Sequence, residues 1–150
     1  MIDIYYLKEA VQNGHAMKCF TIWQPYAELV AIGKKTIEIR KMKISFRGKF
    51  LIYAASLRSI DLTICNKIKL DFSKLATSKV IGLACLYDIK KYSSKEEFEA
   101  DKERHCVPYY YPEAKYGFLL KDAGKFNKPV HILRVRPGIF DVHPEDIVWN

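Results

Sequence analysis

Residues 33–40 read Gly-Lys-Lys-Thr-Ile-Glu-Ile-Arg, and this stretch indicates the structure of the chain around it. Apolar and polar residues alternate strictly in its last five positions, which is typical of a β-strand with one buried face. In that strand Ile37 and Ile39 face the core. Glu38 and Arg40 share the opposite face, where a carboxylate lies beside a guanidinium.

A second strand and a helix are predicted directly before this stretch. Residues 18–22 alternate in polarity and lead into Trp23. Gln24 and Pro25 then open a helix, because proline suits the first helical turn, where its missing N–H would be unpaired anyway. Gly33 ends that helix, since glycine readily adopts the left-handed conformation of a helix C-terminus. Trp23 therefore lies at a strand-to-helix junction.

The rest of the chain predicts more short strands and one charged helix. Ser94 with Glu97 three residues later has the capping-box spacing, so we expect a helix over residues 94–104. The elements together indicate a mixed α+β fold, a small β-barrel of five to six strands with two to three short helices. Apolar runs and alternation predict the later strands at residues 49–55, 79–89, 116–121 and 128–136.

The composition is that of an ordinary globular domain. Of the 150 residues, 49% are hydrophobic and 28% charged, which excludes a disordered or fibrous chain. No apolar run reaches the roughly 18 residues of a membrane span, and the N-terminus lacks the basic flank of a secretory signal. We therefore expect a cytoplasmic protein without a membrane partner. Residues 1–16 are expected to form an N-terminal extension, and residues 17–150 a single domain.

The four cysteines do not form a metal-binding pattern. They are widely spaced, without a Cys-x-x-Cys pair or a Cys–His spacing that suits zinc. Most of them lie in apolar or strand-like surroundings, where a thiol behaves as a small hydrophobic group. We therefore expect structural thiols, no metal and no cofactor. The cysteines are Cys19, Cys65, Cys85 and Cys106.

The positive charge of the chain is concentrated in one stretch. The net charge is +8, and residues 18–75 carry twelve basic and four acidic residues. A concentrated positive field attracts polyanions such as nucleic acids. A basic surface that only aids solubility is an equally good explanation. The basic residues closest in sequence to the predicted strand at 35–40 are Lys34, Lys41, Lys43, Arg47 and Lys49.

Aromatic and polar residues of this region suit a nucleic-acid site. Trp23 could stack on a base, although a lone tryptophan more often packs in the core. Lys35, Glu38 and Arg40 place one acid between two bases, a cluster that holds a phosphate, a base edge or a carboxylate, or that forms an ordinary surface ion pair. The consecutive tyrosines at 109–111 could add stacking or pack against the mouth of the barrel.

Three separated motifs together resemble one known family. Ile22-Trp23-Gln24-Pro25 is followed by Gly33-x-Lys35-x-x-Glu38-x-Arg40, and then by Arg47-Gly48 before a strand that ends Tyr53-Ala-Ala-Ser56. This order is similar to that of the ASCH domain, named for activating signal cointegrator homology, and the likeness extends over roughly residues 17–142. The resemblance implies a fold similar to the PUA domain, with a cleft between the first helix and the barrel.

Members of this family are generally regarded as modules that bind RNA or other nucleic acids, some of them linked to transcription coactivation or RNA modification. By this resemblance Lys35 and Arg40 would meet phosphate in a basic cleft, and Glu38 would read a base edge or hold Arg40 in place. Trp23 would be the stacking platform. The expected contacts to RNA or a nucleotide are Trp23, Gln24, Lys34, Lys35, Glu38, Arg40, Lys41, Lys43, Arg47, Lys49 and Ser56.

A minority of such proteins are enzymes, either N(4)-acetylcytidine deacetylases or ribonucleases. The deacetylases use a signature lysine, a threonine three residues later and a distant glutamate. Lys35 matches the lysine, but Glu38 stands at the threonine position, and a carboxylate is no simple replacement for a hydroxyl. An amidohydrolase or ribonuclease with Lys35 and Glu38 as catalytic residues is therefore the alternative function. A protein-interaction module with a vestigial cleft is the third.

Overall fold

A computed structural model describes residues 2–11, 14–57 and 62–149 of the chain. One curled, seven-stranded sheet forms its centre, in the order β2-β5-β4-β3-β1-β6, with β7 paired to β5. β1 and β3 run parallel, and the other neighbours in this order are antiparallel. The strands are β1 Met17–Gln24, β2 Ile37–Arg40, β3 Gly48–Leu57, β4 Lys79–Lys91, β5 Tyr116–Ile132, β6 Ile139–Val142 and β7 Ile147–Val148.

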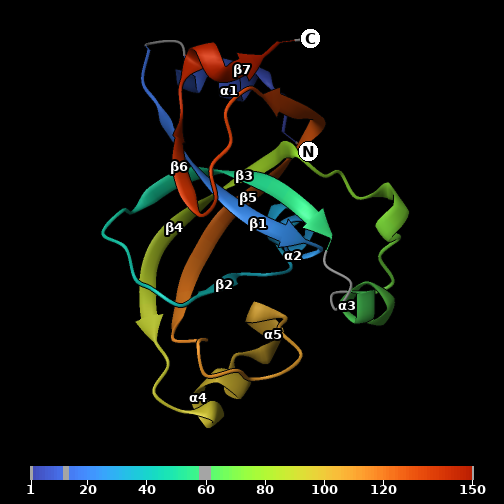
Figure 1. Cartoon of the computed structure of the whole chain (residues 1–150), viewed down its shortest axis with the longest axis vertical. Helices are drawn as coiled ribbons and strands as arrows, with labels where there is room; N and C mark the ends of the chain where they lie inside the picture. The colour runs from blue at the N-terminus through green and yellow to red at the C-terminus, as the bar shows by residue number, and fades with distance from the viewer. Residues whose placement is uncertain (1, 12–13, 58–61, 150) are drawn as a thin grey trace.

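Short helices surround this sheet. Figure 1 shows α4 and α5 at one end of the curled sheet and α1 with β7 at the other. The described residues thus confirm the predicted mixed α+β, barrel-like fold, with more helices than expected. None of these helices has the length and apolar character required to span a bilayer. The α-helices are α1 Tyr5–Val11, α2 Tyr26–Ala31, α3 Leu62–Lys67, α4 Lys95–Ala100 and α5 Lys102–His105, and the 3-10 helices are η2 Phe72–Lys74 and η3 Pro144–Asp146.

Helix α2 packs against the curled sheet and fills its main core. Its small residues, including Ala27 and Ala31, are buried in one cluster with Phe20 of β1 and Phe50 of β3. The rings of Phe20 and Phe50 stack with their centres 4.0 Å apart. Because α2 contacts β1, β3, β4 and β5, the end of β1 and the start of α2 are held in a fixed position. That junction is where the candidate site forms.

The N-terminal segment also contributes to the core. Leu7 and Val11 of α1 are buried in a second cluster with Cys19 of β1. Ile2 donates a backbone hydrogen bond of 2.7 Å to the carbonyl of Lys125, which adds a bridge to the edge of β5. The stretch expected to be an extension therefore packs on the barrel. Residues 1, 12 and 13 of this stretch lie outside the described residues.

The predicted pair of strands at 116–121 and 128–136 is wrong, because the structure has one long strand there. β5 runs without interruption through Asp122, whose φ of 53° bends the strand, and its register against β4 shifts three times. A close approach explains this path. A Cβ at Gly82 would lie 2.3 Å from the carbonyl oxygen of Gly124, so the two strands come nearer than a side chain would permit.

The predicted helix over 94–104 is two helices. Ser94 caps α4 as expected, since its hydroxyl accepts a hydrogen bond of 3.1 Å from the backbone N–H of Glu97. The helix breaks at Asp101, whose carboxylate accepts hydrogen bonds of 2.7 Å from both Lys90 and Tyr92 at the end of β4. Those bonds hold the break against the sheet and direct α5 toward β2.

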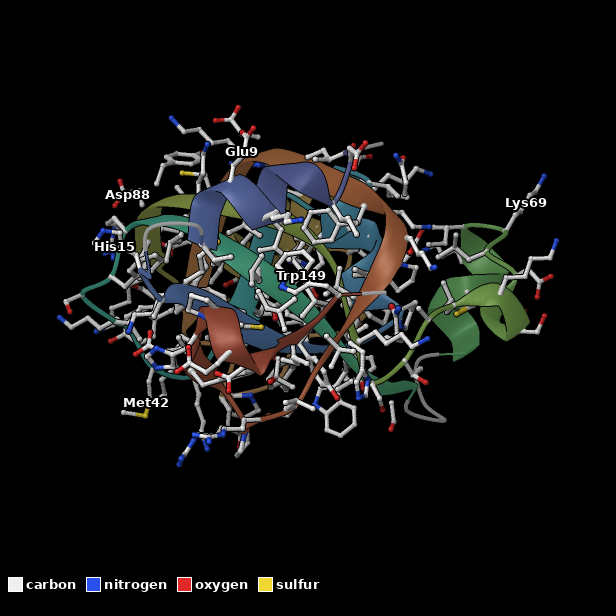
Figure 2. The ribbon with its side chains drawn as sticks, turned by 90° about the horizontal axis from the view of Figure 1, so that it is seen from above. Glu9, His15, Met42, Lys69, Asp88 and Trp149 are labelled. Carbon is white, nitrogen blue, oxygen red and sulfur yellow. The ribbon has the colours of Figure 1, made fainter. Side chains whose placement is uncertain are left out.

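Residues 62–72 carry α3, and residues 58–61 lie outside the described part of the chain. Figure 2 shows that this segment projects from the barrel, with Lys69 at its outer side. Its anchor is Cys65, which is fully buried. The segment therefore adds a wall beside the barrel that the sheet alone does not provide.

Candidate nucleic-acid interface

An open pocket of about 350 Å³ lies where β1 ends beside β2, and we call it the Lys35 pocket. Its walls come from β1, α2, β2, the loop after α5 and the turn before β6. A volume of this size suits one nucleoside-sized ligand. The lining residues are Thr21, Ile22, Trp23, Tyr26, Lys35, Glu38, Ile39, Arg40, Lys41, Val107, Tyr111, Glu113, Pro137 and Gly138.

Lys35 is a buried cation at the base of this pocket. Its backbone N–H donates a hydrogen bond of 2.9 Å to the carbonyl of Leu29, which fixes the turn after α2. The side chain is 1% exposed, and its Nζ donates to the carbonyl of His105 and lies 4.7 Å from the centre of the Tyr26 ring. Burial lowers the pKa of Lys35, and the nearby carboxylate of Glu38 opposes that shift.

Glu38 lies between two cations, as its place on the strand predicted. Its Oε1 is 3.5 Å from Nζ of Lys35, and its Oε2 is 3.2 Å from Nη2 of Arg40. The side chain of Glu38 is 10% exposed, so this is a buried ionic cluster and not the surface ion pair that was the plainer alternative.

Arg40 has a hydrogen-bond donor that none of the described residues satisfies. Its Nη2 donates a hydrogen bond of 2.9 Å to the carbonyl of Thr21 on β1. Its Nε is buried and has no hydrogen-bond partner among the described residues. A buried donor without a partner costs free energy unless a ligand or water supplies an acceptor.

The two residues of the strand-to-helix junction have different environments. Trp23 is 46% exposed at the edge of the pocket, so the alternative of a core tryptophan is wrong. Gln24 is fully buried, and the expectation that it contacts a ligand is wrong. Its Nε2 donates to the carbonyl of Ala76 at 2.8 Å, and its Oε1 accepts from the backbone N–H of Glu28 at 3.0 Å. Gln24 therefore anchors the start of α2.

Most of the predicted basic residues lie outside the pocket lining. Lys41 lines the Lys35 pocket, whereas Arg47 donates hydrogen bonds to the carbonyls of Ile44 and Phe46 in its own loop. The lining contains three cations and two carboxylates, so its own charge is close to balanced. The predicted residues that are exposed and outside the lining are Lys34, Lys43, Arg47, Lys49 and Ser56.

Sequence reasoning missed several residues of the pocket. Tyr26 and Glu113 gave no local signal, because they enter the lining only through the tertiary fold. The run of three tyrosines was noticed, and the structure separates its members. Tyr111 lines the pocket, where burial and then the Glu38 carboxylate raise its pKa to about 12, so its hydroxyl stays protonated. Tyr110 and Tyr111 both pack against the ring of Phe98, at 5.4 Å and 6.4 Å between ring centres, and Tyr110 is not in the pocket lining.

His105 supports the buried lysine through its backbone and is itself neutral. The ring is buried, its Nε2 lies 2.7 Å from the carbonyl of Phe98, and its Nδ1 accepts a hydrogen bond of 2.9 Å from the N–H of Val107. Burial lowers the pKa of His105 to about 4. Because both ring nitrogens have partners, His105 is not available as a base for the adjacent Cys106.

No metal centre accompanies these residues. Among the described parts of the chain, no group of three or more His, Cys, Asp or Glu side chains could hold an ion. The donors and acceptors of the Lys35 pocket are therefore the ammonium, carboxylate, guanidinium and phenol groups described above.

Comparison with known proteins agrees with the geometry. The ASCH domain matches residues 20–130, and no curated protein matches the chain. The crystal structure of ASCH from Zymomonas mobilis is similar, with a TM-score of 0.59 and 18% identity over 86% of this chain and 89% of that one. A Tyr-to-Phe mutant of the same bacterial protein gives the same TM-score and identity over 86% of this chain and 91% of that one. Because the family match extends over most of the chain, the protein belongs to the ASCH domain family.

Proposed function

We propose that this ASCH domain binds RNA by taking one unstacked base into the Lys35 pocket. The observation that carries the proposal is the convergence of Lys35, Glu38 and Arg40 on one open pocket beside the exposed ring of Trp23. Unstacked bases of single-stranded RNA are typically recognised by aromatic stacking combined with hydrogen bonds to a base edge. The pocket offers both kinds of group in a volume that suits one base and its sugar.

The polar groups of the pocket suit a base edge better than a phosphate. Nζ of Lys35 is buried and already donates to His105, so Lys35 holds Glu38 in position and does not meet phosphate from solvent. This revises the expectation that Lys35 contacts the backbone. The Nε of Arg40 needs an acceptor, and Glu38 retains lone pairs beyond its two ion pairs. A donor next to an acceptor matches the amide edge of a pyrimidine or guanine.

Contacts to the phosphate backbone of the RNA are then made by exposed cations at the edge of the Lys35 pocket. Lys41 lines the pocket and is exposed, so its ammonium can reach a phosphate next to the bound base. Lys43 lies two residues further along the same loop and outside the lining. Comparing variants of Lys41 and Lys43 therefore distinguishes a direct phosphate contact from general electrostatic attraction.

The test uses tryptophan fluorescence and short RNA. The chain has two tryptophans, so a Trp149→Phe variant leaves Trp23 as the only reporter. We expect random-sequence RNA hexamers to quench Trp23, and Trp23→Ala to weaken binding measured by calorimetry by roughly tenfold, as for loss of one stacked base. Unchanged binding in Trp23→Ala would remove the Lys35 pocket from RNA recognition.

A matched lysine pair completes that test. Lys41→Ala is expected to weaken hexamer binding roughly fivefold, about the value of one charge-assisted contact, and Lys43→Ala by less than about twofold. Equal losses in the two variants would indicate long-range attraction only. A shallow dependence of affinity on salt would further agree with a pocket whose charges are internally paired.

A second function, hydrolysis of a modified nucleoside or of RNA, is favoured by the state of Lys35. Burial lowers its pKa, which increases the fraction of free amine that can accept a proton, and Glu38 lies 3.5 Å away. An N(4)-acetylcytidine probe tests a deacetylase, and a labelled oligonucleotide tests a ribonuclease. Turnover should disappear in Lys35→Met and in Glu38→Gln. Turnover that persists in both variants, or none in the unmodified protein, rejects this second function.

A further inference from the structure

A second pocket, of about 410 Å³, lies between α3 and α5, and we call it the Cys106 pocket. It shares a wall with the first, because Val107 lines the Lys35 pocket while its neighbours Cys106 and Pro108 line the second. We propose that the Cys106 pocket binds the nucleotide adjacent to the base held in the Lys35 pocket. This inference rests on the proposed RNA binding.

The 106–108 segment lies between the two pockets. Its middle residue, Val107, lines the Lys35 pocket, and the residues on either side of it, Cys106 and Pro108, line the Cys106 pocket. A single layer of backbone is about 5 Å thick. One sugar–phosphate step of an unstacked strand spans such a layer, so neighbouring nucleotides can occupy the two sides.

The charges and apolar surfaces of the Cys106 pocket suit a nucleotide. Lys67 at the end of α3 and Lys102 at the start of α5 come from different helices to the same pocket. Both are exposed, and neither forms an ion pair within the described residues. Between them Ile68 and Pro108 give an apolar surface on which a base can lie. Glu103 also lines the pocket, so its charged residues are two cations and one carboxylate. The two cations beside an apolar surface match phosphate and base together.

The wall holds a fixed position relative to the first pocket. The backbone N–H of Thr36 donates a hydrogen bond of 2.8 Å to the carbonyl of Arg104, and Nε of Arg104 donates back to the Thr36 hydroxyl at 3.3 Å. Lys35, next along the chain, donates to the carbonyl of His105. The segment that lines both pockets is therefore held at one junction between α5 and the start of β2.

Cys106 provides a reporter inside the second pocket. Its side chain is partly exposed, whereas Cys19 and Cys65 are buried, so a Cys85→Ala background leaves Cys106 as the accessible thiol. Burial raises the pKa of Cys106, so methyl methanethiosulfonate is applied at mildly alkaline pH and the product is located by peptide mass. We expect random-sequence RNA trinucleotides to slow this modification roughly tenfold, and a mixture of the four nucleoside monophosphates to leave it almost unchanged.

Paired lysine variants test the site directly. The double variant Lys67→Gln with Lys102→Gln should abolish the protection of Cys106 and weaken trinucleotide binding roughly tenfold, as for two lost phosphate contacts. The control is Lys91→Gln with Lys128→Gln, which removes the same charge from β4 and β5. It should leave both the protection of Cys106 and the binding of the trinucleotide unchanged. Unprotected Cys106 with intact Trp23 quenching overturns the second site and leaves the proposed function standing. Equal protection by monophosphates overturns the adjacency. Absence of both quenching and protection rejects the proposed function itself.

Discussion

The guanidinium of Arg40 on β2 donates a hydrogen bond of 2.9 Å to the carbonyl of Thr21 on β1, although β1 and β2 are not neighbours in the sheet. β2 is one end of the strand order, and β1 lies near the other. The side chain of Arg40 therefore bridges the opening of the half-closed barrel at the point where the Lys35 pocket lies. The shape of the Lys35 pocket and the closure of the barrel therefore both depend on Arg40.

Replacing Arg40 should destabilise the protein even where its charge is kept. Arg40→Lys keeps a cation near Glu38 but loses the planar group that reaches both Glu38 and Thr21. We expect the free energy of unfolding in urea to fall by about 1–3 kcal/mol. Arg47→Lys is the matched control, since the bonds that Arg47 makes within the described residues go to the carbonyls of Ile44 and Phe46 in its own loop, and it should change stability by less than about 0.5 kcal/mol. Equal stability of the two variants would contradict the bridge.

The ion pair of Glu38 with Lys35 should show strong energetic coupling. Glu38→Gln leaves the buried ammonium of Lys35 without its carboxylate, and we expect a loss of about 2–4 kcal/mol, limited by the ability of Lys35 to release its proton. Adding Lys35→Met removes that uncompensated charge. The double variant should therefore unfold at a higher urea concentration than Glu38→Gln alone. Additive losses would show that the two side chains do not interact.

Stability should fall with acid through His105. Its folded pKa is about 4, below the ordinary 6.5, so between these values the unfolded chain binds a proton that the folded chain does not. The free energy of unfolding should therefore decrease as the pH falls from about 6.5 toward 4, by at most about 1.4 kcal/mol per pH unit. Urea denaturation across this range measures the slope. His105→Gln, which cannot titrate, should flatten this dependence of stability on pH. An unchanged slope in that variant would show that another group takes up the proton.

Gln24 should affect stability and not recognition. Gln24→Ala removes two buried hydrogen bonds, to Ala76 and to Glu28, and should lower the free energy of unfolding by about 1–3 kcal/mol. Hexamer binding at a temperature where the variant is fully folded should stay within about twofold of the original. A large loss of hexamer binding by the folded variant would show that Gln24 takes part in recognition after all.

Much of the site was predictable because it follows from local periodicity. The alternation over 36–40 put Glu38 and Arg40 on one face, and the two side chains are indeed 3.2 Å apart. The glycine at 33, with a φ of 82°, ends the turn after α2 as predicted. The Ser94 cap and the long apolar strands β3 and β4 were likewise readable from short stretches. Each of these features depends on one short continuous stretch of the sequence.

The long path of β5 was not predictable in the same way. Asp122 and Gly124 looked like a turn between two strands, since aspartate and glycine are common in turns. The extensive pairing of β5 with β4 outweighs that local preference, and the chain bends at Asp122 without leaving the sheet. Contacts with a distant strand, which no short window contains, supply the deciding free energy.

The sequence by itself indicated an ASCH-type barrel through the resemblance of its three motifs to that family, and a basic stretch through its charge count. It indicated the acid–base cluster through the alternation of one strand, because alternate residues of a strand share a face. Burial of Lys35, the exposure of Trp23, the internal role of Gln24 and the entry of Tyr111 into the pocket depend on which distant segments pack together. Solvent access and charge pairing are properties of that packing. They turn a run of polar residues into a pocket in which Lys35 and Arg40 already have partners, while Lys41 is exposed at the edge.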